Sequence, residues 1–168
     1  MKAIIVCAGK STRTRPLTCN KPKPLLKILD ESLIEHNIKQ VKDFVDEIIL
    51  VVGFMKEKII ELLGENYQGI KITYIEQKEQ LGTGHAVLIC KDHIEDKFIV
   101  MYGDDLYSKE DIKNLLRFDK GALAHETDKP ESFGIYKVDE NNIMLDLIEK
   151  PKKDVGNLAN IGVYLLPR

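Results

Sequence analysis

The chain has 168 residues, 43% of them hydrophobic and 31% charged, which is enough for one domain with a buried core. Its formal net charge of −2 gives no reason to expect non-specific binding to nucleic acid or to anionic lipid. The three cysteines, Cys7, Cys19 and Cys90, are an odd number without CxxC spacing, which argues against a disulfide framework and against a zinc site.

The first apolar run, residues 3–7, predicts both location and structure. It is too short to cross a membrane, and Gly9 and Lys10 interrupt it too early for the core of a signal peptide. Together with the cysteine pattern, this predicts a cytoplasmic protein. Because the run is continuous and ends near a glycine, it also predicts a fully buried strand.

Strands and helices are predicted to alternate over the first two thirds of the chain. Further short apolar runs predict strands at residues 47–52, 70–75 and 98–101. Apolar residues at helical spacing predict helices within residues 34–45, 59–63, 86–90 and 112–116. Asp30 or Ser32 can cap the first helix, and Ser108 with Asp111 has the spacing of a capping box. Alternation of this kind indicates right-handed crossovers and a parallel sheet.

The pattern changes after about residue 121, where strand-like segments follow one another with little room for helices. These segments are residues 122–124, 133–138, 143–148 and 161–166. The sheet is therefore expected to become mixed, which gives an α/β fold with a central, mostly parallel sheet flanked by helices. We expect residues 1–168 to form a single domain.

Three turns follow predicted strands. They are the loop after the first strand, the turn at Gly82 and the turn at Gly103 and Asp104. In an open α/β sheet, ligands bind beyond the carboxyl ends of the strands. The three turns are therefore predicted to face one crevice.

The loop after the first strand combines a glycine, Gly9, with several basic residues. The cations that follow Gly9 are Arg13, Arg15, Lys21 and Lys23. Backbone N–H groups in such a turn can approach phosphate closely, and the basic side chains can neutralise its charge. The alternative is a solvated basic connection between a strand and a helix. The triplet 9–11 is not a Walker A motif, because the required earlier glycine is Ile4, and the dinucleotide pattern GxGxxG is also absent.

Residues 2–13, followed by Arg15-Pro16-Leu17-Thr18 and by Pro22-Lys23-Pro24-Leu25-Leu26, closely resemble the signature of sugar-1-phosphate nucleotidylyltransferases. These enzymes are also called NDP-sugar pyrophosphorylases. The resemblance implies a Rossmann-like nucleotidyltransferase fold. It also implies that Ala8, Gly9, Ser11 and Thr12 bind the nucleotide and that Arg13 and Lys23 are catalytic.

Two positions of this loop depart from the family pattern. Ser11 replaces a usual glycine, and Thr14 replaces a usual apolar residue. Serine is a mild replacement where the backbone conformation tolerates a small residue. If the position requires a positive φ, however, the loop is expected to be strained and activity reduced.

Residues 77–86, QKEQLGTGHA, resemble the nucleobase-binding segment of uridylyl and thymidylyl members of the family. The resemblance implies that Gln77 and the backbone of Gly82 read the pyrimidine edge and that Thr83 also binds the nucleotide. A glutamine side chain offers a donor and an acceptor, which can match the adjacent acceptor and donor of a uracil-type ring. No chemistry is assigned to His85, because a single histidine in such a place is more often structural.

The segment Tyr102-Gly103-Asp104-Asp105 is similar to the metal-binding turn of the family. The resemblance implies that Asp104 is a ligand of Mg²⁺, a hard cation that keeps water ligands and takes one or two carboxylates. Asp105 is interpreted as a bystander or as an outer acceptor.

Three later segments resemble those that hold the sugar phosphate in the family. The resemblance implies that Gly134 lets the backbone approach the sugar and that Glu149 accepts from its hydroxyls. Lys150 would meet the phosphate, and Asn160 would add a polar contact. The resemblance spans residues 2–166, whereas family members are noticeably longer. We therefore expect the chain to be the N-terminal part of the usual family domain, truncated at its carboxyl end and without the second metal ligand.

The implied activity is that of a transferase of nucleotide-sugar biosynthesis. It would move a nucleotidyl group from UTP or dTTP to a sugar 1-phosphate and release pyrophosphate. These two substrates are the expected partners, with neither nucleic acid nor membrane; a homo-oligomer is compatible with the sequence, which leaves the assembly open. One alternative is a weak or inactive homologue that senses nucleotide or sugar phosphate. Another is a nucleotidylyltransferase with a non-sugar acceptor. Glucose, N-acetylglucosamine, mannose and galactose all remain open as the sugar.

Overall fold

The computed structural model describes the whole chain, residues 1–168, which divides into two compact units. The first unit comprises Met1–Gly121 and Tyr164–Arg168, and the second comprises Ala122–Val163. None of the helices is both long and apolar enough to cross a membrane.

The first unit is built on a mostly parallel sheet. Its hydrogen-bonded order is β7 (Phe98–Tyr102), β1 (Lys2–Val6), β4 (Glu47–Val52), β6 (Ile70–Glu76) and β5 (Asn66–Tyr67). The first four are mutually parallel, and only the short β5 runs antiparallel to its neighbour. Every residue of β4 is buried, as expected for a central parallel strand that is covered on both faces. The predicted parallel sheet is therefore confirmed.

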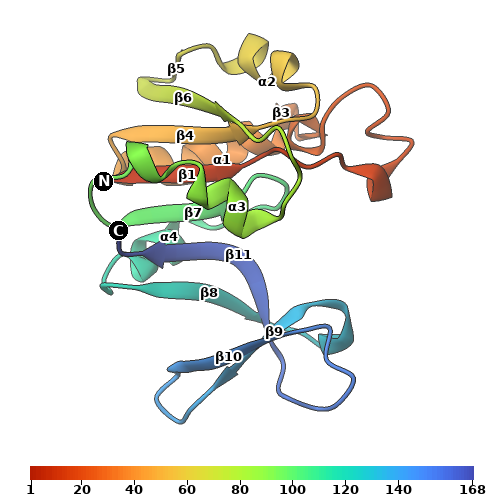
Figure 1. Cartoon of the computed structure of the whole chain (residues 1–168), viewed down its shortest axis with the longest axis vertical. Helices are drawn as coiled ribbons and strands as arrows, with labels where there is room; N and C mark the ends of the chain where they lie inside the picture. The colour runs from red at the N-terminus through yellow and green to blue at the C-terminus, as the bar shows by residue number, and fades with distance from the viewer. The chain divides into compact units, whose positions relative to one another are not determined.

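Helices lie on both faces of this sheet (Figure 1). They are α1 (Leu33–Val41), α2 (Lys56–Leu63), α3 (Thr83–Leu88) and α4 (Lys109–Leu115). Alternate residues of the strands, including Ile4, Ile49 and Val100, form one buried cluster with Ala86 and Cys90 from α3 and the turn after it. In Figure 1, α1 and α4 lie behind the sheet, on the face opposite to α3. The sheet is thus enclosed on both sides.

The helix starts follow local hydrogen bonding. Ser32, and not Asp30, caps α1, and it forms a reciprocal capping box with Glu35. Ser108 caps α4 through its hydroxyl, which accepts from the N–H groups of Glu110 and Asp111. Short 3-10 turns link the larger elements, and they are η1 (Thr12–Thr14), η2 (Lys23–Leu25), η3 (Lys42–Phe44), η4 (Lys91–His93) and η5 (Pro130–Ser132). A two-stranded sheet of β2 (Lys27–Ile28) and β3 (Glu31–Ser32) precedes α1.

The second unit consists mainly of strands. Its order is β10 (Met144–Glu149), β9 (Gly134–Val138) and β11 (Leu158–Leu166), and β8 (Gly121–Glu126) also pairs with β11. Strand β9 pairs antiparallel with both β10 and β11. The last residues of β11, from Tyr164 onward, belong to the first unit. The predicted strands and the predicted mixed sheet are confirmed, although β11 begins three residues earlier than expected.

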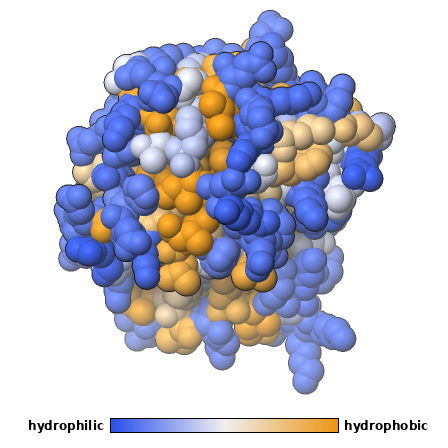
Figure 2. Space-filling model, turned by 45° about the horizontal axis from the view of Figure 1, so that its top comes forward, coloured by the Kyte–Doolittle hydropathy of each residue, from blue (hydrophilic) through white to orange (hydrophobic).

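Hydrophilic side chains cover most of the surface in Figure 2, and apolar side chains gather in separate patches. Among the exposed large apolar residues, Leu81 lies just before α3, and Leu88 is the last residue of that helix. Single exposed leucines of this kind are normal for a folded protein.

At the amino ends of the strands, the buried Glu47 forms an ionic network with two lysines, of which Lys71 is largely exposed. Its carboxylate accepts hydrogen bonds from Thr73 Oγ1 and Lys71 Nζ, and Lys2 Nζ lies 3.1 Å away. Burial by itself raises the pKa of Glu47, but these partners outweigh burial and lower the pKa to about 2. A lowered pKa means that the folded state favours the charged carboxylate over the protonated one.

Glu47→Gln should lower the free energy of unfolding by about 2 kcal/mol at pH 7. The stabilisation by Glu47 is fully present above its unfolded-state pKa near 4.5 and is lost as the pH falls through about 2. The difference between the two proteins should therefore shrink over that window, as urea titrations at a series of pH values would reveal. Glu61→Gln, at an exposed position of α2, is the control. Equal losses in both variants would contradict the role of the network.

Candidate functional site

A cavity of about 220 Å³ lies at the carboxyl ends of β1 and β7. Its walls come from the loop after β1, the turn after β7 and the start of α3. The lining residues are Val6, Cys7, Gly9, Ser11, Lys23, Pro24, Thr83, Tyr102 and Asp104. All of them belong to the first unit. The three turns that were predicted to face one crevice therefore do meet.

The turn after β7 approaches β1 so closely that only glycine fits at position 103. A Cβ atom on Gly103 would lie 2.3 Å from Cys7 Sγ and 3.1 Å from Val6 O. The Gly103 N–H donates to Val6 O at 2.9 Å, which extends the pairing of the two strands by one residue. This close contact fixes the backbone position of Asp104, the next residue, relative to the end of β1.

Asp104 meets Lys23 at the cavity. Lys23 Nζ lies 3.0 Å from Asp104 Oδ2, although the two residues are 81 positions apart in the chain. Their side chains are 31% and 47% exposed, so both remain accessible to a ligand. Lys23, predicted to be catalytic, and Asp104, predicted to bind a metal, are thus adjacent and carry opposite charges.

Asn37 stabilises the same turn through hydrogen bonds from α1. This residue of α1 is fully buried, and its Nδ2 donates to the carbonyls of Asp105 at 2.9 Å and Tyr102 at 3.4 Å. Asn37 was not among the residues predicted from the sequence. The available signal was a polar residue on the apolar face of the helix, between Ile34 and Val41.

The turn fits a magnesium ligand set in which the protein supplies one carboxylate. Asp104 is accessible, and its Oδ2 already forms an ion pair with the Lys23 ammonium. Asp105 Oδ1 accepts from the Leu106 N–H and so is engaged within the turn. No cluster of three or more Asp, Glu, His or Cys side chains could hold a metal by itself. Mg²⁺ usually completes its octahedron with water and substrate phosphates, so a single Asp104 carboxylate is compatible with it.

Cys7 contributes a neutral wall to the cavity. Burial, reinforced by the negative charge of Asp104, raises the pKa of the Cys7 thiol well above its ordinary value. The thiol therefore stays protonated near neutral pH and is a poor nucleophile.

Ser11 has a positive φ of 53° with ψ of 34°, the conformation for which strain was anticipated. Its backbone is nevertheless held firmly. Ser11 O accepts hydrogen bonds from Thr14 Oγ1 at 2.9 Å and from Thr18 Oγ1 at 2.7 Å, and Ser11 Oγ accepts from the Lys23 N–H at 3.2 Å. Thr14, the second residue that departs from the family pattern, is thus hydrogen-bonded directly to Ser11, the first. Together these bonds offset the cost of the left-handed conformation.

Ser11→Ala should destabilise the chain by about 1 kcal/mol, whereas Ser11→Gly should change its stability by less than about 0.5 kcal/mol. Alanine keeps the unfavourable φ and loses the bond to Lys23, but glycine loses the same bond while it relieves the φ. Chemical denaturation of both variants would measure the difference, with the exposed Thr12→Ala as control. Equal effects of alanine and glycine would show that φ at this position carries no cost.

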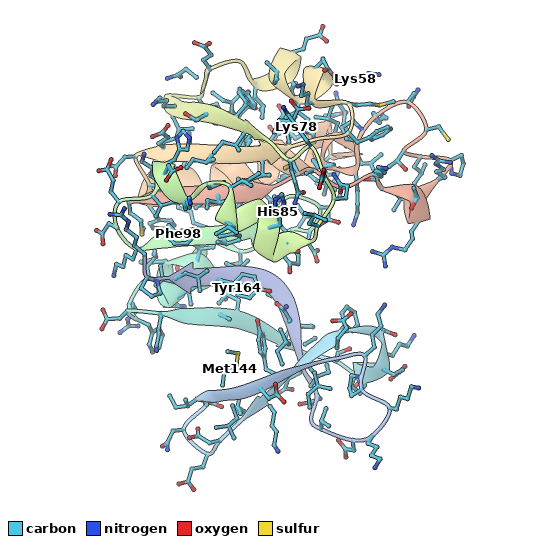
Figure 3. All side chains as sticks on the ribbon, in the orientation of Figure 1. Lys58, Lys78, His85, Phe98, Met144 and Tyr164 are labelled. Atoms are coloured by element: carbon cyan, nitrogen blue, oxygen red, sulfur yellow. The ribbon has the colours of Figure 1, made fainter.

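The predicted nucleobase segment packs against the first loop. Gln77 is only 4% exposed, and its Nε2 donates to Gly82 O at 3.0 Å and contacts His85 Nδ1 at 3.1 Å. Gln80 Nε2 donates to Ala8 O at 2.8 Å and so links this segment to the loop after β1. His85 extends from the first turn of α3, as labelled in Figure 3. Neither Gln80 nor His85 was predicted to matter.

Some predicted residues lie outside the cavity lining. Thr12 and Arg13 lie on the exposed turn η1, and the buried Ala8 has its carbonyl engaged by Gln80. Gln77 and Gly82 lie next to the lining residue Thr83 and do not themselves line the cavity. The cavity therefore brings together Gly9, Ser11, Lys23, Thr83 and Asp104.

The predicted sugar-phosphate residues cluster within the second unit. Glu149 pairs with Gly134 across β10 and β9, and a Cβ atom on Gly134 would lie 3.0 Å from Glu149 Oε2 and 3.9 Å from Asn160 Cβ. Asn160 Oδ1 accepts from Tyr136 Oη at 3.0 Å. Lys150 follows directly, and its N–H donates to Phe133 O at 2.8 Å. The structure thus groups the four residues within the second unit.

Known proteins resemble this chain in both sequence and fold. The model of the family described as "Nucleotidyl transferase" matches residues 2–168. The chain belongs to this family. The resemblance noted from the sequence is therefore confirmed, and the mixed α/β sheet is the fold expected of a nucleotidyl transferase.

Two curated relatives are similar in sequence to this nucleotidyl transferase chain. The "Bifunctional protein GlmU" of Methanococcus maripaludis strain C5 is 44% identical over 168 residues, which are 99% of this chain and 40% of that protein. The "UTP--glucose-1-phosphate uridylyltransferase AglF" of Haloferax volcanii is 33% identical over 172 residues, which cover 98% of this chain and 71% of that protein. The chain thus spans about 40% of the length of the GlmU relatives.

Solved structures share the fold of this nucleotidyl transferase chain. A Bacillus anthracis protein crystallised with sucrose superposes with a TM-score of 0.88 at 26% identity, over 99% of this chain and 71% of that one. A UDP-glucose pyrophosphorylase from Acinetobacter baumanii gives a TM-score of 0.80 at 24% identity, over 99% of this chain and 74% of that one.

Proposed function

We propose that this chain transfers a nucleotidyl group from UTP or dTTP to a sugar 1-phosphate, with release of pyrophosphate. The observation that carries the proposal is the contact of 3.0 Å between Lys23 and Asp104 in the cavity at the carboxyl ends of β1 and β7. It brings a cation and an accessible carboxylate to one place beside a glycine-containing loop. Such an arrangement suits the binding of a polyphosphate together with a hard cation.

The proposed reaction needs no general base. An oxygen of the sugar phosphate attacks the α-phosphorus of the triphosphate, the bond from the α-phosphorus to the bridging oxygen breaks, and pyrophosphate leaves on the opposite side. Because the phosphate is already anionic, catalysis reduces to in-line positioning and charge neutralisation. This fits a cavity whose only thiol, Cys7, is protonated and which holds no histidine.

Each candidate residue has a role in this proposal. Lys23 neutralises phosphate charge within the cavity, and Arg13, on the exposed turn η1, is assigned to the leaving pyrophosphate. Backbone groups of residues 8–12 contact the triphosphate. Mg²⁺ bound at Asp104 would supply further positive charge to the phosphates. Gln77, Gly82 and Thr83 bind the nucleoside.

The acceptor sugar phosphate is assigned to the second unit. In this proposal Gly134 leaves space for the sugar, Glu149 accepts from its hydroxyls, and Lys150 and Asn160 add contacts to its phosphate and polar groups. The name of the Haloferax volcanii relative includes UTP and glucose 1-phosphate, which makes this pair the first to test.

The test is pyrophosphate release from UTP, dTTP, CTP, ATP and GTP with a panel of sugar 1-phosphates. The panel should contain glucose, N-acetylglucosamine, mannose and galactose 1-phosphates and a non-sugar phosphate such as phosphocholine. We expect turnover with a pyrimidine triphosphate and at least one sugar 1-phosphate. Nucleotide binding without turnover would instead indicate a sensing homologue, and turnover only with the non-sugar acceptor would overturn the choice of substrate.

A further inference from the structure

Gln77 uses both hydrogens of its side-chain amide within the protein. Its Nε2 lies 3.0 Å from Gly82 O and 3.1 Å from His85 Nδ1. Gly82 O is a carbonyl and can only accept, so the Gln77 atom between the two partners must be the nitrogen. The second hydrogen of that nitrogen then points to His85 Nδ1, which has to be the unprotonated nitrogen of its ring. His85 is therefore the neutral tautomer with its proton on Nε2.

The oxygen of the same amide remains available. Gln77 Oε1 accepts no hydrogen bond within the chain. It is nevertheless not a fully buried atom, because Asn37 Oδ1 is the only fully buried side-chain polar atom that lacks a partner. Gln77 Oε1 must therefore reach the surface, although the residue as a whole is only 4% exposed. Gly82, which receives one of the Gln77 hydrogens, is followed directly by Thr83, a lining residue of the cavity.

The opposite orientation of the amide is unfavourable. Rotation by 180° would place Gln77 Oε1 against Gly82 O and His85 Nδ1, two acceptors with no hydrogen between them and the oxygen. Gly82 O is one of the two acceptors that orient the Gln77 amide, and as a carbonyl oxygen it is always an acceptor. His85 Nδ1 is the second acceptor only while it carries no proton.

We propose that His85 is a specificity-determining positioning residue, which together with Gly82 fixes the Gln77 amide so that only its oxygen faces the base. The inference rests on the proposed function. An acceptor at this place pairs with the ring N–H of uracil or thymine, but it opposes the lone pair on the corresponding ring nitrogen of cytosine. Gln77 thus offers the base an acceptor alone, and not the donor and acceptor pair that the sequence suggested.

Nucleotide binding tests the proposal without any need for turnover. The dissociation constants of UTP and CTP would be measured by calorimetry for the unmodified chain, His85→Ala and His85→Asn. His85→Ala should lower the preference for UTP over CTP about five-fold, because one of the two bonds that orient Gln77 is lost. His85→Asn should restore most of the preference, since the asparagine oxygen can accept where Nδ1 did.

His93→Ala is the matched control, because His93 is an exposed histidine on η4 away from the cavity. It should leave both dissociation constants unchanged. If His85→Ala weakens UTP and CTP equally, or if His85→Asn fails to restore the ratio, the effect is structural and the proposal is wrong.

A second measurement is independent of the variants and of their folding. Nitrogen chemical shifts of the His85 ring in the unmodified chain should show an unprotonated Nδ1 and a protonated Nε2 near neutral pH. A protonated Nδ1 would overturn the orientation of Gln77. If the ring has the expected tautomer but the chain binds neither nucleotide, the proposed function fails and the orientation of Gln77 stands.

Discussion

Lys23→Ala should lower the turnover number about 100- to 1000-fold while it changes KM for the triphosphate by much less. Lys23 is the only positively charged side chain that lines the cavity, and its ammonium lies 3.0 Å from Asp104. In the proposed reaction, negative charge moves onto the departing pyrophosphate as its bond to the α-phosphorus breaks. A fixed ammonium stabilises that charge most strongly in the transition state, so its loss should affect turnover more than binding.

Steady-state kinetics of pyrophosphate release would measure both constants. Lys27→Ala is the matched control, because Lys27 is an exposed lysine on β2 outside the cavity lining and its loss should change neither constant. A rise in KM with unchanged turnover would show that Lys23 only binds the ground state.

Asp104→Asn should reduce turnover at least about 100-fold and raise the Mg²⁺ concentration needed for half-maximal activity. Asparagine keeps the size of the side chain but removes the negative charge that attracts a hard cation. The variant should remain folded, because the partly exposed ion pair with Lys23 contributes at most about 1 kcal/mol. Circular dichroism would verify the fold, and titration of Mg²⁺ at saturating substrate would measure the shift.

The neighbouring carboxylate provides a sharp comparison for this experiment. Asp105 is also exposed, but its Oδ1 accepts from the Leu106 N–H, and it does not line the cavity. Asp105→Asn should therefore leave the Mg²⁺ dependence nearly unchanged. An unchanged Mg²⁺ dependence in Asp104→Asn would remove Asp104 from the metal site.

The sequence predicts the sheet well because its strands are buried on both faces. The run 47–52 is continuous and apolar apart from Glu47, and β4 has the predicted bounds. The turns that follow such strands were also found, since glycines mark their ends. The sequence therefore predicts that Ser11, Thr83 and Asp104 converge, and the cavity contains all three.

The supporting contacts of the site could not be predicted in the same way. Asn37, Gln80 and His85 each act through one or two side-chain hydrogen bonds, and those of Asn37 and Gln80 join residues at least 65 positions apart. Such bonds leave no periodic pattern in a sequence, because each depends on how separate elements meet after folding. The position of Arg13 on an exposed turn is likewise a property of the folded loop and not of its composition.

Ser11 and Thr14 are the two positions of the loop that depart from the family pattern. The hydrogen bond from Thr14 Oγ1 to Ser11 O links them, so that the two departures act together on the stability of the loop. Position-by-position scoring counts a lost glycine and a lost apolar residue as two separate defects. In the folded chain, the Thr14 hydroxyl helps to stabilise the left-handed backbone conformation of Ser11, which a side chain at position 11 disfavours. Replacing Thr14 alone with an apolar residue should therefore cost more than replacing it beside Ser11→Gly, and a double-mutant cycle should be non-additive. Engineering of this loop has to treat positions 11 and 14 as a linked pair.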